Sequence, residues 1–177
     1  MNKKNSIFFA VALFTVLIVT IPTSEVFAYT YFPLHIATKT VSFKWSGICE
    51  TPGTTYRDGW ENAISDWYNS NNATFYYNSS SVNELDCLYE VDSNLYGRTY
   101  YTPNWLHTYI ESFQCLLNAS NTNIYNQHVA RSTAVHELGH VLGLDHNSNV
   151  SIMNNNRDRS QIYTPQQDDI NGVNSIY

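Results

Sequence analysis

The sequence predicts one α+β domain, in which strands and helices share a single hydrophobic core. The chain has 177 residues, which suits one domain rather than two. Several short segments alternate in side-chain type, as half-buried strands do. Three longer segments carry apolar residues at helical spacing beside capping signals. Because no repeat or interdomain linker separates these segments, we expect them to form one unit.

The N-terminal segment has the pattern of a secretory signal peptide. Lys3 and Lys4 precede an apolar run over residues 7–21, and Val26-Phe27-Ala28 resembles a cleavage site. A membrane anchor requires about 20 apolar residues, more than this run offers. We therefore expect residues 1–28 to be a signal peptide and the mature protein to be secreted, extracellular and free of the membrane. Residues 29–39 would be an N-terminal segment or short pro-segment, before a main domain at 40–177.

The first predicted strand and helix come early in the main domain. Thr40–Trp45 alternates in side-chain type and is expected to be a strand. Thr55 and Asp58 resemble a capping box, which predicts that a helix begins there. That helix carries an apolar face and should end in the Asn/Ser stretch at 69–72; the face is formed by Trp60, Ile64, Trp67 and Tyr68.

Four further strands are predicted in the middle of the chain, at residues 73–77, 85–91, 96–101 and 110–117. The second of these carries acidic side chains, which together could be a calcium site: Glu84, Asp86, Glu90 and Asp92. They lack the spacing of an EF-hand loop, so a solvated face is the preferred interpretation.

Two helices complete the chain. The longer should begin near residues 123–126 and run to about Leu142. The last should have Thr164 as its N-cap, Pro165 at its first position and Gln167 completing a capping box.

Composition narrows the class of protein. The net charge is −6 and Lys and Arg are scattered, so the footprint of a nucleic-acid-binding protein is absent. Three cysteines are an odd number, and in an oxidising compartment we expect one disulfide and one buried thiol. The sequence does not select the pair among Cys49, Cys87 and Cys115.

The chemistry of the chain is concentrated in one segment that begins with His136, Glu137 and His140. The two histidines are four residues apart, so both imidazoles project from one helix face and can reach one Zn²⁺ ion. Glu137 can then reach a water on that ion. Gly143 suits the left-handed turn that ends a helix, and such a turn would bring His146 back as a third ligand. Three nitrogen ligands leave one open position, as catalytic zinc sites do.

This pattern, His-Glu-x-x-His-x-x-Gly-x-x-His, resembles the signature of the metzincin zinc peptidases. Met153, soon after His146, is similar to their Met-turn methionine. Residues 168–177 resemble the C-terminal helix of matrixins, as does the strand ending at Asn118 before the active-site helix.

The resemblance implies a twisted five-stranded mixed sheet with three helices and an active-site cleft above a small C-terminal subdomain. It also implies an edge strand at 96–103, beside which an extended substrate would lie. Asp168 and Asp169 would tie the last helix to the Met-turn, or serve as charges at a helix N-terminus.

The chain departs from the matrixin pattern in several ways. A structural-zinc loop and a cysteine switch are not visible, so His107 and His128 are interpreted as ordinary histidines. His35 is the one metal-directed candidate in residues 29–37. Asn155 occupies the position at which some relatives carry a tyrosine ligand. A Ca²⁺ site remains possible but has no motif to support it.

The function expected from the motif and the resemblance is that of a secreted zinc endopeptidase. It would hydrolyse peptide bonds by attack of a zinc-bound water, with Glu137 as general base and acid. His136, His140 and His146 would bind the single catalytic ion, supported by Gly143 and Met153. Its partner would be a protein or peptide substrate, and we expect a monomer. The alternatives are a catalytically silent zinc-binding adhesion or inhibitor module and a zinc hydrolase of non-peptide amides.

Overall fold

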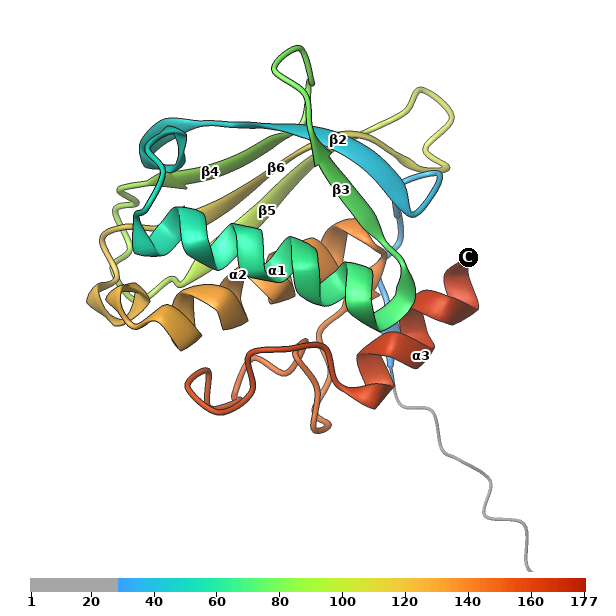
Figure 1. The fold of residues 1–177 in the computed structure, drawn as a ribbon. Coiled ribbons are helices and arrows are strands. Elements are labelled where there is room, and N and C mark those ends of the chain that lie inside the picture. The colour runs from blue at the N-terminus through green and yellow to red at the C-terminus, as the bar shows by residue number, and fades with distance from the viewer. Residues whose placement is uncertain (1–28) are drawn as a thin grey trace, which may run out of the picture.

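The computed structural model describes residues 29–177, so the predicted signal peptide lies outside the described residues. A five-stranded sheet is covered on one face by α1 and α2, which lie side by side (Figure 1). The segment that follows α2 and the short helix α3 form the lower part of the molecule. The elements in chain order are β1 Thr30–Tyr31, β2 Thr40–Trp45, η1 Gly47–Glu50, α1 Thr55–Asn71, β3 Thr74–Tyr77, β4 Glu84–Leu88, β5 Gly97–Pro103, β6 Ile110–Asn118, η2 Thr122–Tyr125, α2 Gln127–Val141, β7 Leu144–Asp145 and α3 Gln167–Ile176.

The sheet is mixed, with strand order β3-β2-β4-β6-β5. All neighbours in it are parallel except β5, which is antiparallel to β6 and forms one edge. The predicted α+β class, mixed five-stranded sheet and three α-helices are therefore confirmed, as is the edge strand expected at 96–103. Parallel neighbours require long crossovers, and α1 supplies one of them between β2 and β3.

Helix α1 packs through two tryptophans that are fully buried. The indole nitrogen of Trp60 donates to Asp86 O at 3.1 Å, and that of Trp67 donates to Val135 O at 3.0 Å. Two details of the predicted helix were wrong. Tyr68 is 54% exposed, because its position one residue after Trp67 turns it toward solvent. The N-cap is Thr54, one residue before the predicted box, and its Oγ1 accepts from Arg57 N at 3.2 Å.

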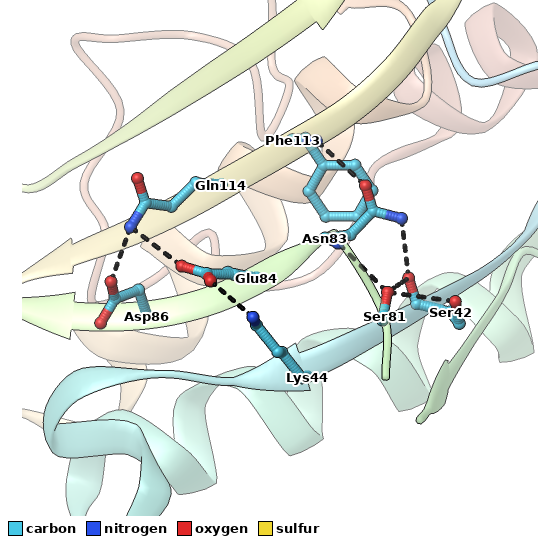
Figure 2. Close-up of polar contacts among 8 residues, drawn as sticks. All are labelled: Ser42, Lys44, Ser81, Asn83, Glu84, Asp86, Phe113 and Gln114. Atoms are coloured by element: carbon cyan, nitrogen blue, oxygen red, sulfur yellow. Dashed lines mark hydrogen bonds and ion pairs between the residues drawn. The ribbon is translucent and has the colours of Figure 1, made fainter. Parts of the chain in front are cut away.

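The acidic residues predicted to form a solvated face lie on β4, and at Asp86 that prediction was wrong, because the residue is 1% exposed. Strand β4 lies between β2 and β6, so its carboxylates meet polar side chains of both neighbours (Figure 2). Gln114 Nε2 donates to Asp86 Oδ2 at 2.8 Å and to Glu84 Oε2 at 3.3 Å. Lys44 Nζ lies 3.1 Å from Glu84 Oε1. These contacts give both carboxylates partners within the sheet.

Asn83 anchors the start of β4 to both neighbouring strands. Its Nδ2 donates to Ser42 O at 2.9 Å on β2, and its Oδ1 accepts from Phe113 N at 3.0 Å on β6 (Figure 2). Because these partners are backbone groups, the side-chain amide of Asn83 holds the register of three strands where β4 begins.

The three cysteines are free and buried, so the predicted disulfide is absent from this structure. Cys49 and Cys87 are neighbours whose thiols hydrogen-bond, and that bond together with burial raises the pKa of Cys49. The Cys115 thiol instead lies 3.9 Å from Glu137 O and 3.5 Å from Thr99 Oγ1. The expectation of a bridge came from the odd count and the expected compartment, neither of which specifies the bonding state of the folded thiols.

The N-terminal segment is part of the folded domain. β1 pairs antiparallel with β7, and Ile36 bridges to Ile110 on β6. His35, the predicted metal-directed side chain, instead packs its ring against Tyr177 at 5.2 Å. Within residues 29–177 no helix is long and apolar enough to span a membrane.

The capping of α3 also differs from prediction. The N-cap is Gln166 rather than Thr164, and its backbone N–H donates to Asp169 Oδ2 at 2.8 Å. The predicted box is displaced by two residues because Asp169, three residues after Gln166, is the acceptor that the fold brings to this end of the helix.

Candidate metal centre

The centre is built on α2, which packs against β5 and β6 of the sheet and against α1 and is buried along most of its length. His136 and His140 are one turn apart on this helix, and their rings are 4.8 Å apart between centroids. Both side chains are buried. The spacing therefore places two imidazoles on one helix face, as predicted from the sequence.

Gly143 makes the turn that returns the chain to these histidines. Its φ is +97°, which strongly favours glycine, and its N–H donates to His140 O at 3.0 Å. A Cβ at this position would lie 2.8 Å from Ile176 Cδ1 and from the side chain of His35. After the turn, β7 leads directly to His146, whose Nε2 lies 3.2 Å from Nε2 of both His136 and His140.

The donor set fits a bound cation. His136 Nδ1 lies 2.8 Å from Ile152 O, and His140 Nδ1 lies 2.9 Å from Leu144 O. A backbone carbonyl only accepts, so both Nδ1 atoms carry the proton and both Nε2 atoms point a lone pair at His146. One proton on His146 can satisfy only one of these lone pairs, whereas a metal ion can accept all three nitrogens. Within residues 29–177, these histidines form the one cluster of three or more potential metal ligands that the fold brings together.

Burial keeps these imidazoles neutral, as metal ligands must be. It lowers the pKa of His136 well below its ordinary value and that of His140 to about 4. The pKa of His146 is also lowered, with burial again the main cause. His146 is the most exposed of the three, so it forms the open side of the cluster.

Glu137 lies beside the cluster and is buried, at 4% exposure of the residue. Thr99 Oγ1 on β5 donates to Glu137 Oε2 at 2.8 Å. Burial raises the pKa of Glu137 to about 7, against the lowering effect of this hydrogen bond. A Cβ at Gly97 would lie 2.8 Å from Glu137 Oε1, so the carboxylate occupies space that a larger residue on β5 would fill.

Thr99, Gly97 and Arg157 were not among the site residues predicted from the sequence. Arg157 is buried; its Nε donates to Ser132 Oγ at 3.0 Å and its Nη1 lies 3.3 Å from His136 Nδ1. None of the three has a local motif. Their roles depend on the pairing of β5 with β6 and on the path of the loop after Met153.

Met153 closes the centre from below. Its side chain is buried, and a Cβ at Gly139 would lie 2.6 Å from its Sδ, so the turn packs directly on the helix that bears the histidines. Asp169 holds this turn in place: its Oδ2 accepts from Ile152 N at 2.8 Å and its Oδ1 accepts from Ser151 Oγ. The tie between the last helix and the Met-turn, expected from the resemblance, is thus present at Asp169.

A cleft of about 440 Å³ opens in front of the histidines. Its walls come from β5, α2 and the polar stretch after Met153, and Phe32 lines its other end. His107 and His128 lie away from the cleft, and His128 stacks on Tyr163 at 4.3 Å. Asn155 lines the cleft but does not belong to the histidine group.

The sheet, the helix that bears the histidines and the methionine turn beneath them place this protein in the metzincin class of zinc peptidases. The family model of the matrixins matches residues 67–177, more than half of the chain. The chain therefore belongs to the matrixin family. A comparison with curated protein sequences finds no significant match.

Among solved structures, the chain is similar to high choriolytic enzyme 1, a hatching-enzyme zinc protease from the medaka fish Oryzias latipes. The sequence identity is 14% and the TM-score is 0.49; the match covers 82% of this chain and 94% of that one.

Proposed function

We propose that this matrixin-family protein is a secreted zinc endopeptidase, with His136, His140 and His146 as ligands of one catalytic ion and Glu137 as general base and acid. The observation that carries the proposal is the convergence of the three Nε2 atoms beside a buried carboxylate in an open cleft. Zinc held by these residues would supply a Lewis acid that activates a water for attack near neutral pH.

The protein's own groups then have distinct tasks. Glu137 accepts a proton from the attacking water and later delivers it to the leaving amine. Its pKa of about 7, raised by burial, suits both halves of this cycle near neutral pH. Thr99 Oγ1 orients the carboxylate through Oε2, which leaves Oε1 for the proton transfer. Gly143 and Met153 support the histidines, through the turn and through packing.

Strand β5 offers a binding edge for an extended substrate. It forms one edge of the sheet, and Gly97, Arg98 and Thr99 line the cleft beside Glu137. A peptide laid antiparallel along this edge would form main-chain hydrogen bonds and bring a scissile bond across the cleft. An endopeptidase requires such a binding mode, because both ends of its substrate continue beyond the site.

The secretion, the extracellular location and the monomeric state belong to the same proposal. The N-terminal pattern over residues 1–28 supports secretion and cleavage after Ala28, and the mature protein would then act free of membrane and nucleic acid. We propose no calcium requirement.

The proposal is tested by replacing Glu137 with alanine in zinc-loaded protein. Zinc content should stay at one ion per chain, whereas peptide cleavage should fall by about 10²–10⁴-fold, the contribution of a general acid–base group. Digestion of a peptide library with and without a chelator separates the endopeptidase from a silent zinc-binding module. Unchanged turnover in the metal-loaded variant contradicts the mechanism, and an inert wild-type protein supports the silent module.

A further inference from the structure

Three arginines line the cleft that holds the histidine cluster. Arg98 comes from β5, and Arg157 and Arg159 come from the loop after Met153. The acidic side chains lining the same cleft are Glu137 and Asp145. The chain as a whole carries a net charge of −6, so this concentration of positive charge runs against its composition.

These arginines have no carboxylate partner among residues 29–177. The ion pairs of the described part of the chain involve other basic residues and lie outside the cleft; they are Lys44–Glu84, Arg57–Glu61 and Arg131–Asp66. Two arginines outside the cleft thus form short ion pairs, while Arg157 and Arg159 inside it interact with Glu137 only at longer range. Uncompensated charge in a partly closed cleft is costly and attracts anionic groups strongly.

Arg157 is held in place by hydrogen bonds to the protein. Its guanidinium uses donors on all three nitrogens within the protein: Nε to Ser132 Oγ and Nη2 to Ser132 O, both at 3.0 Å, and Nη1 to Asn154 O at 3.0 Å. It therefore contributes charge rather than free hydrogen-bond donors.

Arg159, in contrast, has no hydrogen bond from Nη2 within residues 29–177. Its guanidinium lies over the Tyr96 ring at 3.9 Å from the centroid, which holds the group in a defined plane. Its one hydrogen bond within the described chain runs from Nη1 to Asn155 O at 3.4 Å, and its buried Nε has no partner there. Tyr96 and Arg159 both line the cleft, and both also line a second hollow beside η2, so the guanidinium lies where the two meet. Arg98 stands on the exposed rim, where Nη1 donates to the hydroxyl of Tyr100 at 3.1 Å.

We propose that the cleft has an acidic-side-chain subsite, in which Arg159 binds the carboxylate of a substrate Asp or Glu within about three residues of the scissile bond, assisted by the charge of Arg157. A planar guanidinium matches a carboxylate through two parallel hydrogen bonds, and stacking on an aromatic ring reduces the conformational freedom lost on binding. The position is close to the scissile bond because the same cleft contains Glu137. This inference rests on the proposed peptidase function and extends it to the class of substrate.

The test uses zinc-loaded protein and pairs of peptides that differ only by Glu or Gln at each position within three residues of the cleaved bond. At one position on one side of that bond, Glu should raise kcat/KM by about 10- to 100-fold over Gln, as expected for hydrogen bonds to a charged group. Arg159→Ala should bring kcat/KM for the Glu peptide down to that for the Gln peptide, with zinc content still at one ion per chain. Arg159→Glu should reverse the preference toward a Lys peptide.

Arg57→Ala is the matched control, because Arg57 also stacks on an aromatic ring, at 3.7 Å from the Trp45 centroid, but lies outside the cleft. It should leave the Glu/Gln ratio unchanged. Equal kcat/KM for Glu and Gln peptides at every position overturns the subsite, as does an Arg159→Ala variant that keeps the preference.

If the wild-type protein cleaves no peptide, the proposed function fails but the subsite remains testable. Fluorescence polarisation of the same labelled peptides should then still show tighter binding of the Glu form, weakened by Arg159→Ala and by salt. Equal binding of the Glu and Gln forms overturns the subsite independently of catalysis.

Discussion

Replacing Asp169 with alanine should destabilise the protein by about 3–5 kcal/mol, because it removes the acceptor that holds the methionine turn. The carboxylate is buried and accepts from Ile152 N and Gln166 N, both at 2.8 Å, and from Ser151 Oγ. An unpaired buried donor costs about 1–3 kcal/mol, and the variant leaves two buried donors and one part-buried donor, Gln166 N, without this acceptor. The expected loss of unfolding free energy is at the low end of the summed costs, because a water can enter the space left by the carboxylate and pair with some of the donors.

The matched control is Asp168→Ala, one residue earlier in the same helix. Asp168 is half-buried, and its Oδ2 accepts from the side-chain amides of Asn147 and Asn149 at 3.2 Å each. These amides can turn to water when the carboxylate is removed, so the loss should be about 1 kcal/mol or less. The free energy of unfolding is measured by urea denaturation of metal-free protein, with the denaturation slope compared to confirm that the unfolded states are alike.

A conservative variant connects this tie to the metal centre. Asp169→Asn keeps an oxygen for the two backbone donors but loses the charge, so it should fold with an intermediate loss. Ile152 O is the partner of His136 Nδ1 at 2.8 Å, so a loosened turn should also weaken zinc binding, by up to about 10-fold. Equal losses in Asp169→Ala and Asp168→Ala, or a loss below about 1 kcal/mol in Asp169→Ala, would refute the reasoning.

Two further predictions concern the turn and the ligands. Gly143→Ala should lower the free energy of unfolding by about 2–4 kcal/mol, because an alanine is strained at this positive φ and its Cβ would lie 2.8 Å from Ile176 Cδ1. The control is Gly53→Ala, at φ +76° with nothing within 4 Å of the new Cβ, which should lose only the backbone contribution of about 1 kcal/mol. Equal shifts of the unfolding midpoint in the two variants would show that packing plays no part. Zinc affinity, measured by chelator competition, should resist acid: burial lowers the pKa of His140 to about 4 from an ordinary 6.5, so protons compete for this ligand only as the pH approaches 5. The stability of the metal-free protein should respond to acid in the same direction but at higher pH. The unfolded chain binds protons below pH 6.5 that the folded apoprotein does not, so stability is lost as the pH falls from about 6.5 toward about 4. A zinc affinity that falls steeply already at pH 6.5 would contradict the assigned shift.

Local spacing was sufficient to locate most of the elements. The alternation of Thr40–Trp45 and the apolar face around Trp60 and Trp67 depend on periods of two and 3.6 residues, which are properties of the backbone itself. The predictions that were wrong concern features set by residues that are distant in the sequence and adjacent in the fold. The burial of Asp86 follows from the position of β4 between two strands, and the N-cap of α3 was displaced because Asp169 supplies the acceptor.

The sequence by itself determined the histidine centre, since His136 and His140 share a helix face and Gly143 is a residue that turns the chain back toward His146. These are relations within eleven residues, which backbone geometry alone enforces. The tertiary structure alone decided which groups surround that centre. Thr99 reaches Glu137 through the register of β5, and Arg159 reaches the cleft through a loop packed on Tyr96. Such contacts join segments about 40 to 60 residues apart, whose approach depends on how the whole core packs, so spacing along the chain carries no signal of them.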